Sequence, residues 1–126
     1  YKLDPVLTSE AYVRHSFMSH SQYADQAVVE GVMGLFDGAT GIDDTASTAH
    51  IARLLGLPVV LAVDCGRMAR SLAALIQGYQ SFDQRVKIVG VVLNRVGSDR
   101  HLQLLTDALK AINMPILGVF RREKDL

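Results

Sequence analysis

Three continuous apolar runs, separated by helical patterns, constrain the fold of this chain more than any other feature. They cover residues 58–64, 86–94 and 116–120, and before its terminal Asn94 the second is apolar throughout except for Lys87 near its start. Unbroken apolar strands are typical of parallel sheets that are buried on both faces. Strands that alternate with helices along the chain predict the same architecture. We therefore expect an α/β domain, a three-layer, doubly wound and mainly parallel sheet with helices on both faces.

Helical patterns occupy the stretches between these runs. They predict helices over residues 7–24, from residue 47 or 48 onward, over residues 67–82, and after Ser98. Thr8 and Ser98 are residue types that cap helix N-termini. Gly56 occupies the position of a C-cap glycine, and Pro58 prevents the helix from continuing. A helix therefore comes first in this chain, although an α/β domain normally opens with a strand, so we expect a strand to be missing upstream.

The segment around Glu30 is the most distinctive local pattern. It reads Val28-Val29-Glu30-Gly31-Val32-Met33-Gly34-Leu35-Phe36-Asp37-Gly38. The apolar residues predict a buried strand over residues 27–30 that ends in an acid, and the glycines predict a loop leaving it. A buried carboxylate needs an ion-pair partner or a metal, which makes Glu30 a candidate metal ligand. The alternative is an acid that caps a loop or faces water.

Polar residues end the predicted strands. In open α/β sheets, ligands bind beyond the carboxyl ends of the strands. Those ends carry Glu30, Asp64 and Asn94, and the last strand is followed by Arg121 and Arg122. Arginine holds phosphate or carboxylate groups in a bidentate fork, although solvated arginines are the ordinary alternative. We expect any ligand site to lie at this edge.

Several catalytic signatures are absent from the sequence. No Gly-Lys pair exists, so no phosphate-binding loop of the form G-x-x-x-x-G-K-[ST] is present, and no G-x-G-x-x-G occurs. The glycines near Glu30 could form an anion-binding nest or simply permit a tight turn. The 4 histidines lack zinc-binding spacing, which favours surface or packing roles. Cys65 follows a strand end without a nucleophile elbow, which favours a buried thiol over a nucleophile.

Composition restricts the partners and the compartment. The 13 basic and 13 acidic side chains balance, which argues against nucleic acid and anionic membranes as partners. No apolar run reaches the length of a membrane span. The single cysteine fits a reducing compartment. We expect a cytoplasmic protein of one domain, and because Tyr1 is not an initiator residue, a piece of a longer chain.

Taken together, these residues resemble the cobyrinic acid a,c-diamide synthases, which belong to the dethiobiotin-synthetase-like group of phosphate-loop enzymes. The segment from Val29 to Gly38 resembles the most distinctive internal motif of that family. Further segments match in order and spacing, with Lys2 where asparagine is usual: Leu3-Asp4-Pro5, Ser47-Thr48-Ala49, residues 58–64, Gly66-Arg67-Met68-Ala69-Arg70-Ser71 and Val91-Val92-Leu93-Asn94-Arg95-Val96-Gly97. The resemblance covers essentially the whole chain.

The resemblance implies what surrounds this chain. In that family a first strand and the phosphate loop precede the segment, and a glutaminase domain with a nucleophilic cysteine follows it. Residues 1–126 would then be a partial ATP-binding synthetase domain, and Cys65 does not match the glutaminase nucleophile. The isolated chain is expected to be inactive.

The resemblance also implies the chemistry. The family uses ATP and magnesium to phosphorylate the c and then the a acetate groups of a corrin ring. Ammonia released from glutamine then replaces phosphate to give amides of cobyrinic acid. A homodimer is among the assemblies that the resemblance allows.

The resemblance also implies roles for individual residues of this sequence. Glu30 matches the magnesium-binding acid, and Asp37 matches an acid at the substrate and intermediate end of the site. Asn94 matches the asparagine that contacts adenine. The weaker assignments place Arg121 and Arg122 at the adenine pocket, and Ser47 and Thr48 at the substrate.

Two alternatives remain open at the level of the sequence. One is a metal-sirohydrochlorin diamide synthase of the same family. The other belongs to a different class, a regulatory or partner-binding module with a degenerate nucleotide site. Such a module would have no reason to keep Glu30, Asp37 and Asn94 together at one edge.

Overall fold

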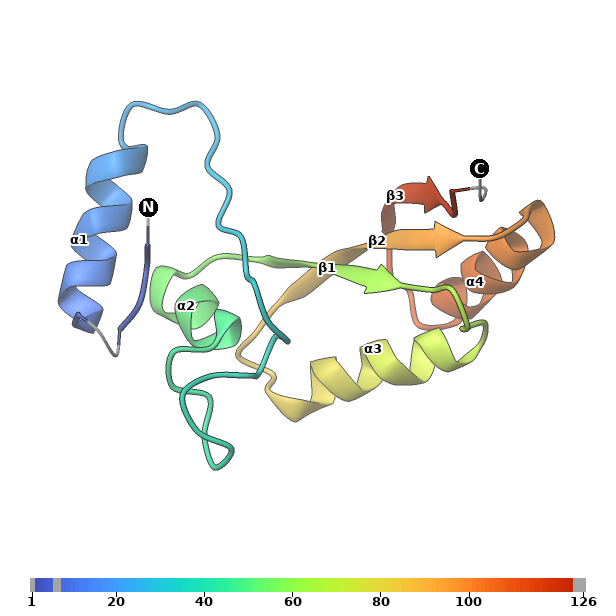
Figure 1. The fold of residues 1–126 in the computed structure, drawn as a ribbon, viewed down its shortest axis with the longest axis horizontal. Helices are drawn as coiled ribbons and strands as arrows, with labels where there is room; N and C mark the ends of the chain where they lie inside the picture. Colours follow the sequence, from blue (N-terminus) through green and yellow to red (C-terminus); the bar gives the residue numbers. More distant parts are fainter. Residues whose placement is uncertain (1, 6–7, 124–126) are drawn as a thin grey trace. The chain divides into compact units, whose positions relative to one another are not determined.

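The computed structural model describes residues 2–5 and 8–123, which belong to two compact units (Figure 1). The first unit spans Tyr1–Leu57 and the second spans Pro58–Leu126. The first contains helices α1 (Glu10–Ser21) and α2 (Thr48–Leu55), and the second contains a parallel sheet with two helices. Each unit is described by itself below.

The second unit is a repeated strand-helix-strand arrangement. Its elements are, in chain order, β1 (Val59–Asp64), α3 (Ser71–Phe82), β2 (Ile88–Val96), α4 (Asp99–Ala111) and β3 (Ile116–Arg121). The 3 strands are parallel in the order β1-β2-β3. The predicted α/β class with a parallel sheet is therefore confirmed.

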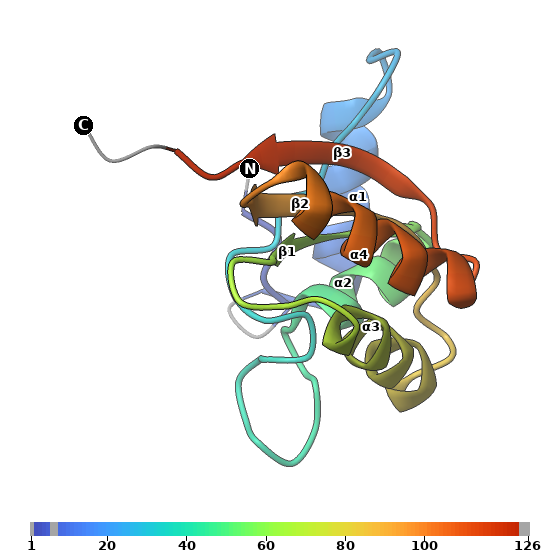
Figure 2. The same ribbon diagram turned by 90° about the vertical axis from the view of Figure 1, so that its right-hand side faces the viewer.

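Helices α3 and α4 lie on the same face of this sheet, as Figures 1 and 2 show. Crossovers between parallel strands are almost always right-handed, and here both crossovers move across the sheet in one direction. Both helices are therefore carried to one face. Along β1, Val59 and Val63 are buried whereas Val60 is 48% exposed. The expectation that this strand is buried on both faces is wrong at Val60. Helices that cover the face opposite α3 and α4 stay a prediction.

Helix α4 begins and ends close to the predicted positions. Ser98 caps it, because its Oγ accepts a hydrogen bond of 3.0 Å from the N–H of His101. Leu105 and Leu109 are fully buried on its inner face. Asn113 follows the helix in the left-handed region, with φ of 55°. This turn leads the chain into β3.

Helix α3 begins later than predicted, at Ser71. The preceding residues form a turn in which the N–H of Met68 donates to the carbonyl of Cys65 at 3.0 Å. Leu72 and Ile76 provide the buried stripe that the periodicity predicts. The difference lies only at the helix N-terminus, where a local turn takes the place of the predicted first helical turn.

Helix α1 (Glu10–Ser21) is shorter than the predicted helix over residues 7–24, of which residue 7 lies outside the described residues. Its N-cap is Ser9, whose Oγ accepts from the N–H of Tyr12 at 3.1 Å. The predicted cap Thr8 instead donates its hydroxyl to the carbonyl of Asp4 at 2.5 Å. The prediction of Thr8 as the cap was therefore wrong by one residue.

Helix α2 (Thr48–Leu55) begins at one of the two predicted positions and confirms the predicted C-cap glycine. The Oγ of Ser47 accepts from the N–H of His50 at 3.0 Å, and Ser47 is only 1% exposed. Gly56 ends the helix in the left-handed conformation, with φ of 65°. Glycine carries no β-carbon and therefore adopts this conformation without steric cost.

The strand predicted over residues 27–30 is not present. These residues are irregular and join no sheet within the described part of the chain. Val28 is 93% exposed, and Glu30 is exposed as well. A strand needs a neighbouring backbone to satisfy its N–H and C=O groups, and an apolar run does not specify that neighbour. The predicted buried carboxylate at Glu30 is therefore also wrong.

None of the helices that the structure describes is long and apolar enough to cross a membrane.

Candidate functional site

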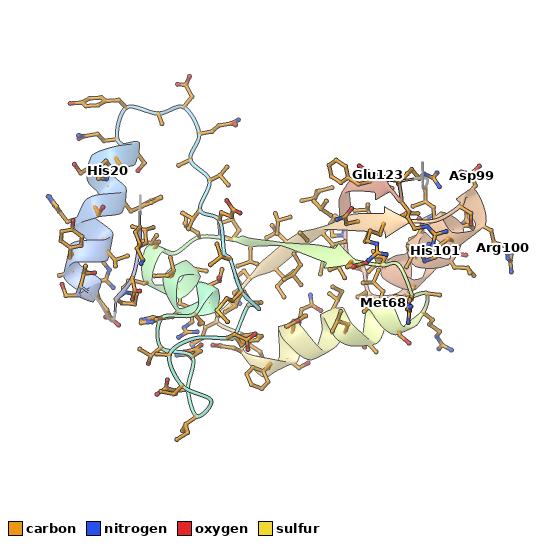
Figure 3. The ribbon with its side chains drawn as sticks, in the orientation of Figure 1. His20, Met68, Asp99, Arg100, His101 and Glu123 are labelled. Carbon is orange, nitrogen blue, oxygen red and sulfur yellow. The ribbon has the colours of Figure 1, made fainter. Side chains whose placement is uncertain are left out.

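A cavity of about 590 Å³ lies within the first unit. Helix α1, the irregular segment around Glu30 and the beginning of α2 surround it. His20 of α1, labelled in Figure 3, is one of the residues that line it. The polar residues of its wall are Ser16, His20, Ser21, Gln26, Glu30, Ser47 and Thr48. The cavity therefore combines a carboxylate, hydroxyl groups and an imidazole with apolar walls.

Three of the predicted site residues meet at this cavity. Glu30, Ser47 and Thr48 all line it. The hydroxyl of Ser47 is already engaged, because it caps α2. Glu30 is exposed, so its charge is solvated and needs no buried counter-ion. The carboxylate is thus accessible to a ligand because it is exposed, whereas the sequence predicted a buried carboxylate that requires a partner.

The glycine at position 31 is required by Thr48. A β-carbon built on Gly31 would lie 2.8 Å from Cγ2 of Thr48 and would also overlap its Oγ1. The absence of a side chain therefore lets the first residue of α2 pack against the backbone beside Glu30. This packing holds two predicted site residues at one place in the cavity wall.

Asp37 stands in the same glycine-rich segment but is not among the residues that line the cavity. Its N–H donates to the carbonyl of Gly34 at 3.0 Å, which closes a tight turn. The preceding Leu35 is buried, and its carbonyl accepts from the N–H of Ala49 at 2.9 Å. The turn is thereby attached to the first turn of α2. The Asp37 carboxylate itself is exposed.

The second unit gathers the other predicted site residues at the carboxyl edge of its sheet. Asp64 and Asn94 are register partners at the ends of β1 and β2. The carbonyl of Asn94 accepts from the N–H of Cys65 at 2.8 Å, and its Oδ1 accepts from the N–H of Arg95 at 2.9 Å. An amide oxygen has two lone pairs, so Oδ1 retains one for a ligand. The prediction of polar strand ends at one edge is confirmed for this pair.

Arg95 adopts an unusual backbone conformation at this edge, with φ of 60°. Non-glycine residues in the left-handed region cluster at functional sites, where the surrounding structure holds them. The guanidinium of Arg95 contacts Oδ2 of Asp64 at 3.1 Å. Both side chains are exposed, so this ion pair adds little stability.

The pKa of Asp64 lies below its ordinary value. The main cause is the hydrogen bond of 3.0 Å that its Oδ1 accepts from the N–H of Gly66, with a smaller contribution from Arg95. Burial raises the pKa of the neighbouring Cys65 thiol, which is fully inaccessible to solvent. A thiol with a raised pKa is a poor nucleophile, so the prediction of a buried, unreactive cysteine is supported.

The two arginines at the end of β3 differ in their contacts, since Arg121 is the last residue of the strand and Arg122 follows it. Arg121 forms an exposed ion pair of 2.8 Å with Asp99, in the first turn of α4. The backbone N–H of Arg122 donates to the carbonyl of Val96 at 2.8 Å. Its guanidinium lies beside Gly97. Both arginines therefore border the same edge as Asn94.

Sequence reasoning overlooked His50 and His101. The Nδ1 atoms of these residues accept hydrogen bonds from the N–H groups of Ala46 and Gly97. Each histidine lies three positions after the serine that caps its helix. This Ser-x-x-His spacing was visible in the sequence and could have identified them.

The described residues contain no group of three or more His, Cys, Asp or Glu side chains that could hold a metal ion. A single accessible carboxylate, such as Glu30, fits only a cation whose other ligands are water and phosphate oxygens. Magnesium is bound in this way in nucleotide sites.

Comparison with known proteins identifies relatives over the whole chain. The family model for the CobQ/CobB/MinD/ParA nucleotide binding domain matches residues 1–126. The chain is 64% identical over 124 residues to a cobyrinate a,c-diamide synthase from Synechococcus sp., covering 98% of this chain and 27% of the relative. It is 57% identical over 126 residues to the enzyme of that name from Synechocystis sp., with 98% and 26% covered.

A third relative carries a different name. The chain is 50% identical over 120 residues to a hydrogenobyrinate a,c-diamide synthase from Streptomyces coelicolor, covering 95% of this chain and 25% of that protein. The chain thus spans about a quarter of the length of these relatives. No solved structure matches. The match over all 126 residues and the parallel α/β sheet agree, and the chain belongs to the CobQ/CobB/MinD/ParA nucleotide-binding domain family, which has the phosphate-loop NTPase fold.

Proposed function

We propose that this chain is part of the ATP-binding synthetase domain of an amidoligase that acts on a corrin-ring acid. The protein would convert the a and c acetate carboxylates of cobyrinic acid to amides in cobalamin biosynthesis. The observation that carries the proposal is the cavity in which Glu30 meets Ser47 and Thr48. This cavity lies in a segment that is 64% identical to a cobyrinate a,c-diamide synthase.

The reaction requires ATP because a carboxylate is a poor electrophile. A carboxylate oxygen of the acetate attacks the γ-phosphorus, the bond to the ADP oxygen breaks, and an acyl phosphate forms. A glutaminase domain hydrolyses glutamine to glutamate and ammonia. The lone pair of ammonia attacks the acyl carbon, the bond to phosphate breaks, and loss of a proton gives the amide. Positioning and charge neutralisation account for most of such catalysis.

The proposed roles follow the positions of the side chains in each unit. In the first unit, Glu30 faces the metal-nucleotide complex, Asp37 serves the substrate and acyl-phosphate end, and Ser47 and Thr48 contact the tetrapyrrole. Glu30 is suited to its role because it is accessible and lines the cavity. Magnesium would neutralise charge on the transferring phosphoryl group, with Glu30 as one of its oxygen ligands.

In the second unit, Asn94 contacts the adenine base. Its exposed amide can donate through Nδ2 and accept through the remaining lone pair of Oδ1. Arg121, the last residue of β3, and Arg122, which follows it, border the adenine pocket. Arg121 is held toward this edge by its ion pair with Asp99.

The names of the relatives favour a second substrate. The Streptomyces coelicolor relative is named for hydrogenobyrinate and the Synechococcus sp. relative for cobyrinate, and both names give the a and c positions as those that become amides. We propose that the protein accepts the corrin through its acetate groups, whichever form of the macrocycle carries them. Amidation of both acids by the full-length protein would support this proposal. Amidation of a metal-sirohydrochlorin alone would instead identify the protein as the related metal-sirohydrochlorin diamide synthase. A cytoplasmic location, a homodimer and the absence of nucleic acid or membrane partners accompany the proposal.

The test uses the full-length protein that contains this chain and the variant Glu30→Gln. This change removes the charge and keeps the size of the side chain. We expect ATP-dependent amidation of cobyrinic acid to fall by about 10²-fold or more. Hydrolysis of glutamine should stay within about twofold of the original rate, since it occurs in another domain.

Asp25→Asn is a matched control, because Asp25 is an exposed carboxylate of the same unit that does not line the cavity. It should leave both activities unchanged. Equal loss of amidation and glutamine hydrolysis in Glu30→Gln would indicate a structural role for Glu30. Unchanged amidation would refute its catalytic role.

A further inference from the structure

The same arrangement of hydrogen bonds occurs at the beginnings of α2 and α4. In each, a serine hydroxyl caps the helix by accepting the N–H of a histidine three positions later. The imidazole of that histidine reaches back and accepts the N–H of the residue before the serine. The two reciprocal bonds join Ala46 to His50 at 2.9 Å and Gly97 to His101 at 3.0 Å. We call this arrangement a histidine capping box. It differs from the usual capping box, in which a Glu or Gln accepts the N–H of the capping residue itself, because here the imidazole accepts the N–H of the residue before the cap.

These bonds determine the protonation pattern of each imidazole. A backbone N–H can only donate, so Nδ1 must be the unprotonated acceptor in both rings. The proton of the neutral ring therefore resides on Nε2. A glutamate at this position would have no hydrogen-bond donor. Histidine has the Nε2–H donor, and in both cases this donor reaches a second element of the fold.

The remaining donor of His101 joins two loops at the carboxyl edge of the sheet. Its Nε2–H donates to the carbonyl of Met68 at 2.6 Å, and both residues are labelled in Figure 3. Met68 belongs to the turn between β1 and α3, whereas His101 fixes the turn between β2 and α4. Asn94 belongs to β2, which leads into the second turn, and its carbonyl accepts the N–H of Cys65, where the first turn begins. His101 therefore restrains the two turns that are connected to the proposed adenine contact.

The remaining donor of His50 joins α2 to α1. Its Nε2–H donates to Oε1 of Glu10 at 2.9 Å. Its Nδ1 meanwhile holds Ala46, a non-glycine residue whose φ is 69°. Ala46 and Ser47 both line the cavity that contains Glu30. His50 therefore restrains the cavity wall in the same way that His101 restrains the sheet edge.

We infer that His50 and His101 are positioning residues, each of which fixes the proposed site residues of its own unit through a histidine capping box and a tether to a second element. His101 sets the geometry of the nucleotide-binding edge, and His50 sets the geometry of the wall that faces the tetrapyrrole. Neither touches a reacting atom. The assignment of the two ligands rests on the proposed function, whereas the two tethers rest on the hydrogen bonds alone.

Three substitutions of His101 in the full-length protein separate the two bonds. In glutamine, the oxygen and nitrogen of the amide can replace Nδ1 and Nε2, so His101→Gln retains both bonds. His101→Glu retains the acceptor for Gly97 but cannot donate to the Met68 carbonyl. His101→Leu loses both bonds. The series thereby distinguishes the histidine capping box from the tether.

Amide hydrogen exchange tests the geometry without reference to function. Exchange at Gly97 should stay slow in His101→Gln and His101→Glu and accelerate about tenfold in His101→Leu, because only leucine removes the acceptor. For the other box, exchange at Ala46 should stay slow in His50→Gln and accelerate in His50→Leu. Unchanged exchange in both leucine variants would overturn the inference.

Steady-state kinetics test the role in the site. We expect KM for ATP to rise about tenfold in His101→Glu and His101→Leu, to remain near the original value in His101→Gln, and kcat to change little. His50→Leu should instead raise KM for cobyrinic acid. An equal effect of the glutamine and leucine variants, or an effect of both histidines on the same substrate, would refute the positioning roles. Absence of ATP-dependent amidation in the unsubstituted protein would refute the proposed function, and the exchange measurements would still decide the two bonds from Ala46 and Gly97 to the imidazoles.

Discussion

The carboxylate of Asp37 lies across the α-carbon of Gly34, where a β-carbon would overlap its Oδ2 atom. The turn is closed by the hydrogen bond from the N–H of Asp37 to the carbonyl of Gly34, 3.0 Å long. The glycine therefore serves the orientation of an acid rather than forming an anion-binding nest. The position of the proposed substrate-side carboxylate depends on the absence of one methyl group.

Gly34→Ala should displace the Asp37 carboxylate. We expect amidation by the full-length protein to fall at least about tenfold, because small misplacements of catalytic groups are costly. Gly41→Ala is the matched control, since a β-carbon at Gly41 meets nothing within 4 Å. Amidation should be unchanged in the control. Full activity of Gly34→Ala would show that the orientation of Asp37 is unimportant.

Acidification should release the turn after β1. The pKa of Asp64 is lowered mainly by the hydrogen bond from Gly66, so the ionised form is favoured in the folded protein. The resulting stabilisation is present above the unfolded pKa of about 3.9 and is lost as the pH falls through the lower folded value. We therefore expect the exchange protection factor of the Gly66 amide to fall below about pH 4. In Asp64→Asn the protection should be weaker at neutral pH and depend less on pH in this range.

Cys65 should resist alkylation in the folded protein. Burial raises the pKa of its thiol and excludes reagent, because the side chain is fully inaccessible. Iodoacetamide at pH 8 should therefore modify the native protein far more slowly than the protein unfolded in guanidinium chloride. Mass spectrometry after timed quenching measures both rates. Equal rates would indicate that the thiol is exposed and would contradict the structure.

Leu105 and Leu104 offer an internally matched comparison on α4. Leu105 is fully buried, whereas Leu104 is 41% exposed. Leu105→Ala should lower the free energy of unfolding of the second unit by about 2–5 kcal/mol through lost burial and a residual cavity. Leu104→Ala should change it by less than about 1 kcal/mol. Urea unfolding followed by circular dichroism measures both values. Similar losses of unfolding free energy in the two variants would show that Leu105 is not a core residue.

Local chemistry determined much of this protein. Ser47, Gly56 and Ser98 specified helix ends because capping depends on the residue itself and its nearest backbone neighbours. The three apolar runs specified the strands and the parallel α/β class, because parallel strands need long crossover connections and the helices between the runs provide them. The motif around Glu30, together with the other matching segments, pointed to a family that the comparisons then showed.

Only the tertiary structure decided the remaining features, because they depend on partners distant in the sequence. Residues 27–30 have the apolar character of a strand but no neighbouring strand to pair with in the described chain, so Glu30 is accessible at a cavity instead of buried at a sheet edge. Val60 is exposed because both crossover connections have the same hand and place their helices on the other face of the sheet. The second bond of His101 joins it to Met68, 33 residues away, and no local pattern specifies such a pairing. The sequence determines which groups each segment presents, and the packing of the chain determines which of them meet.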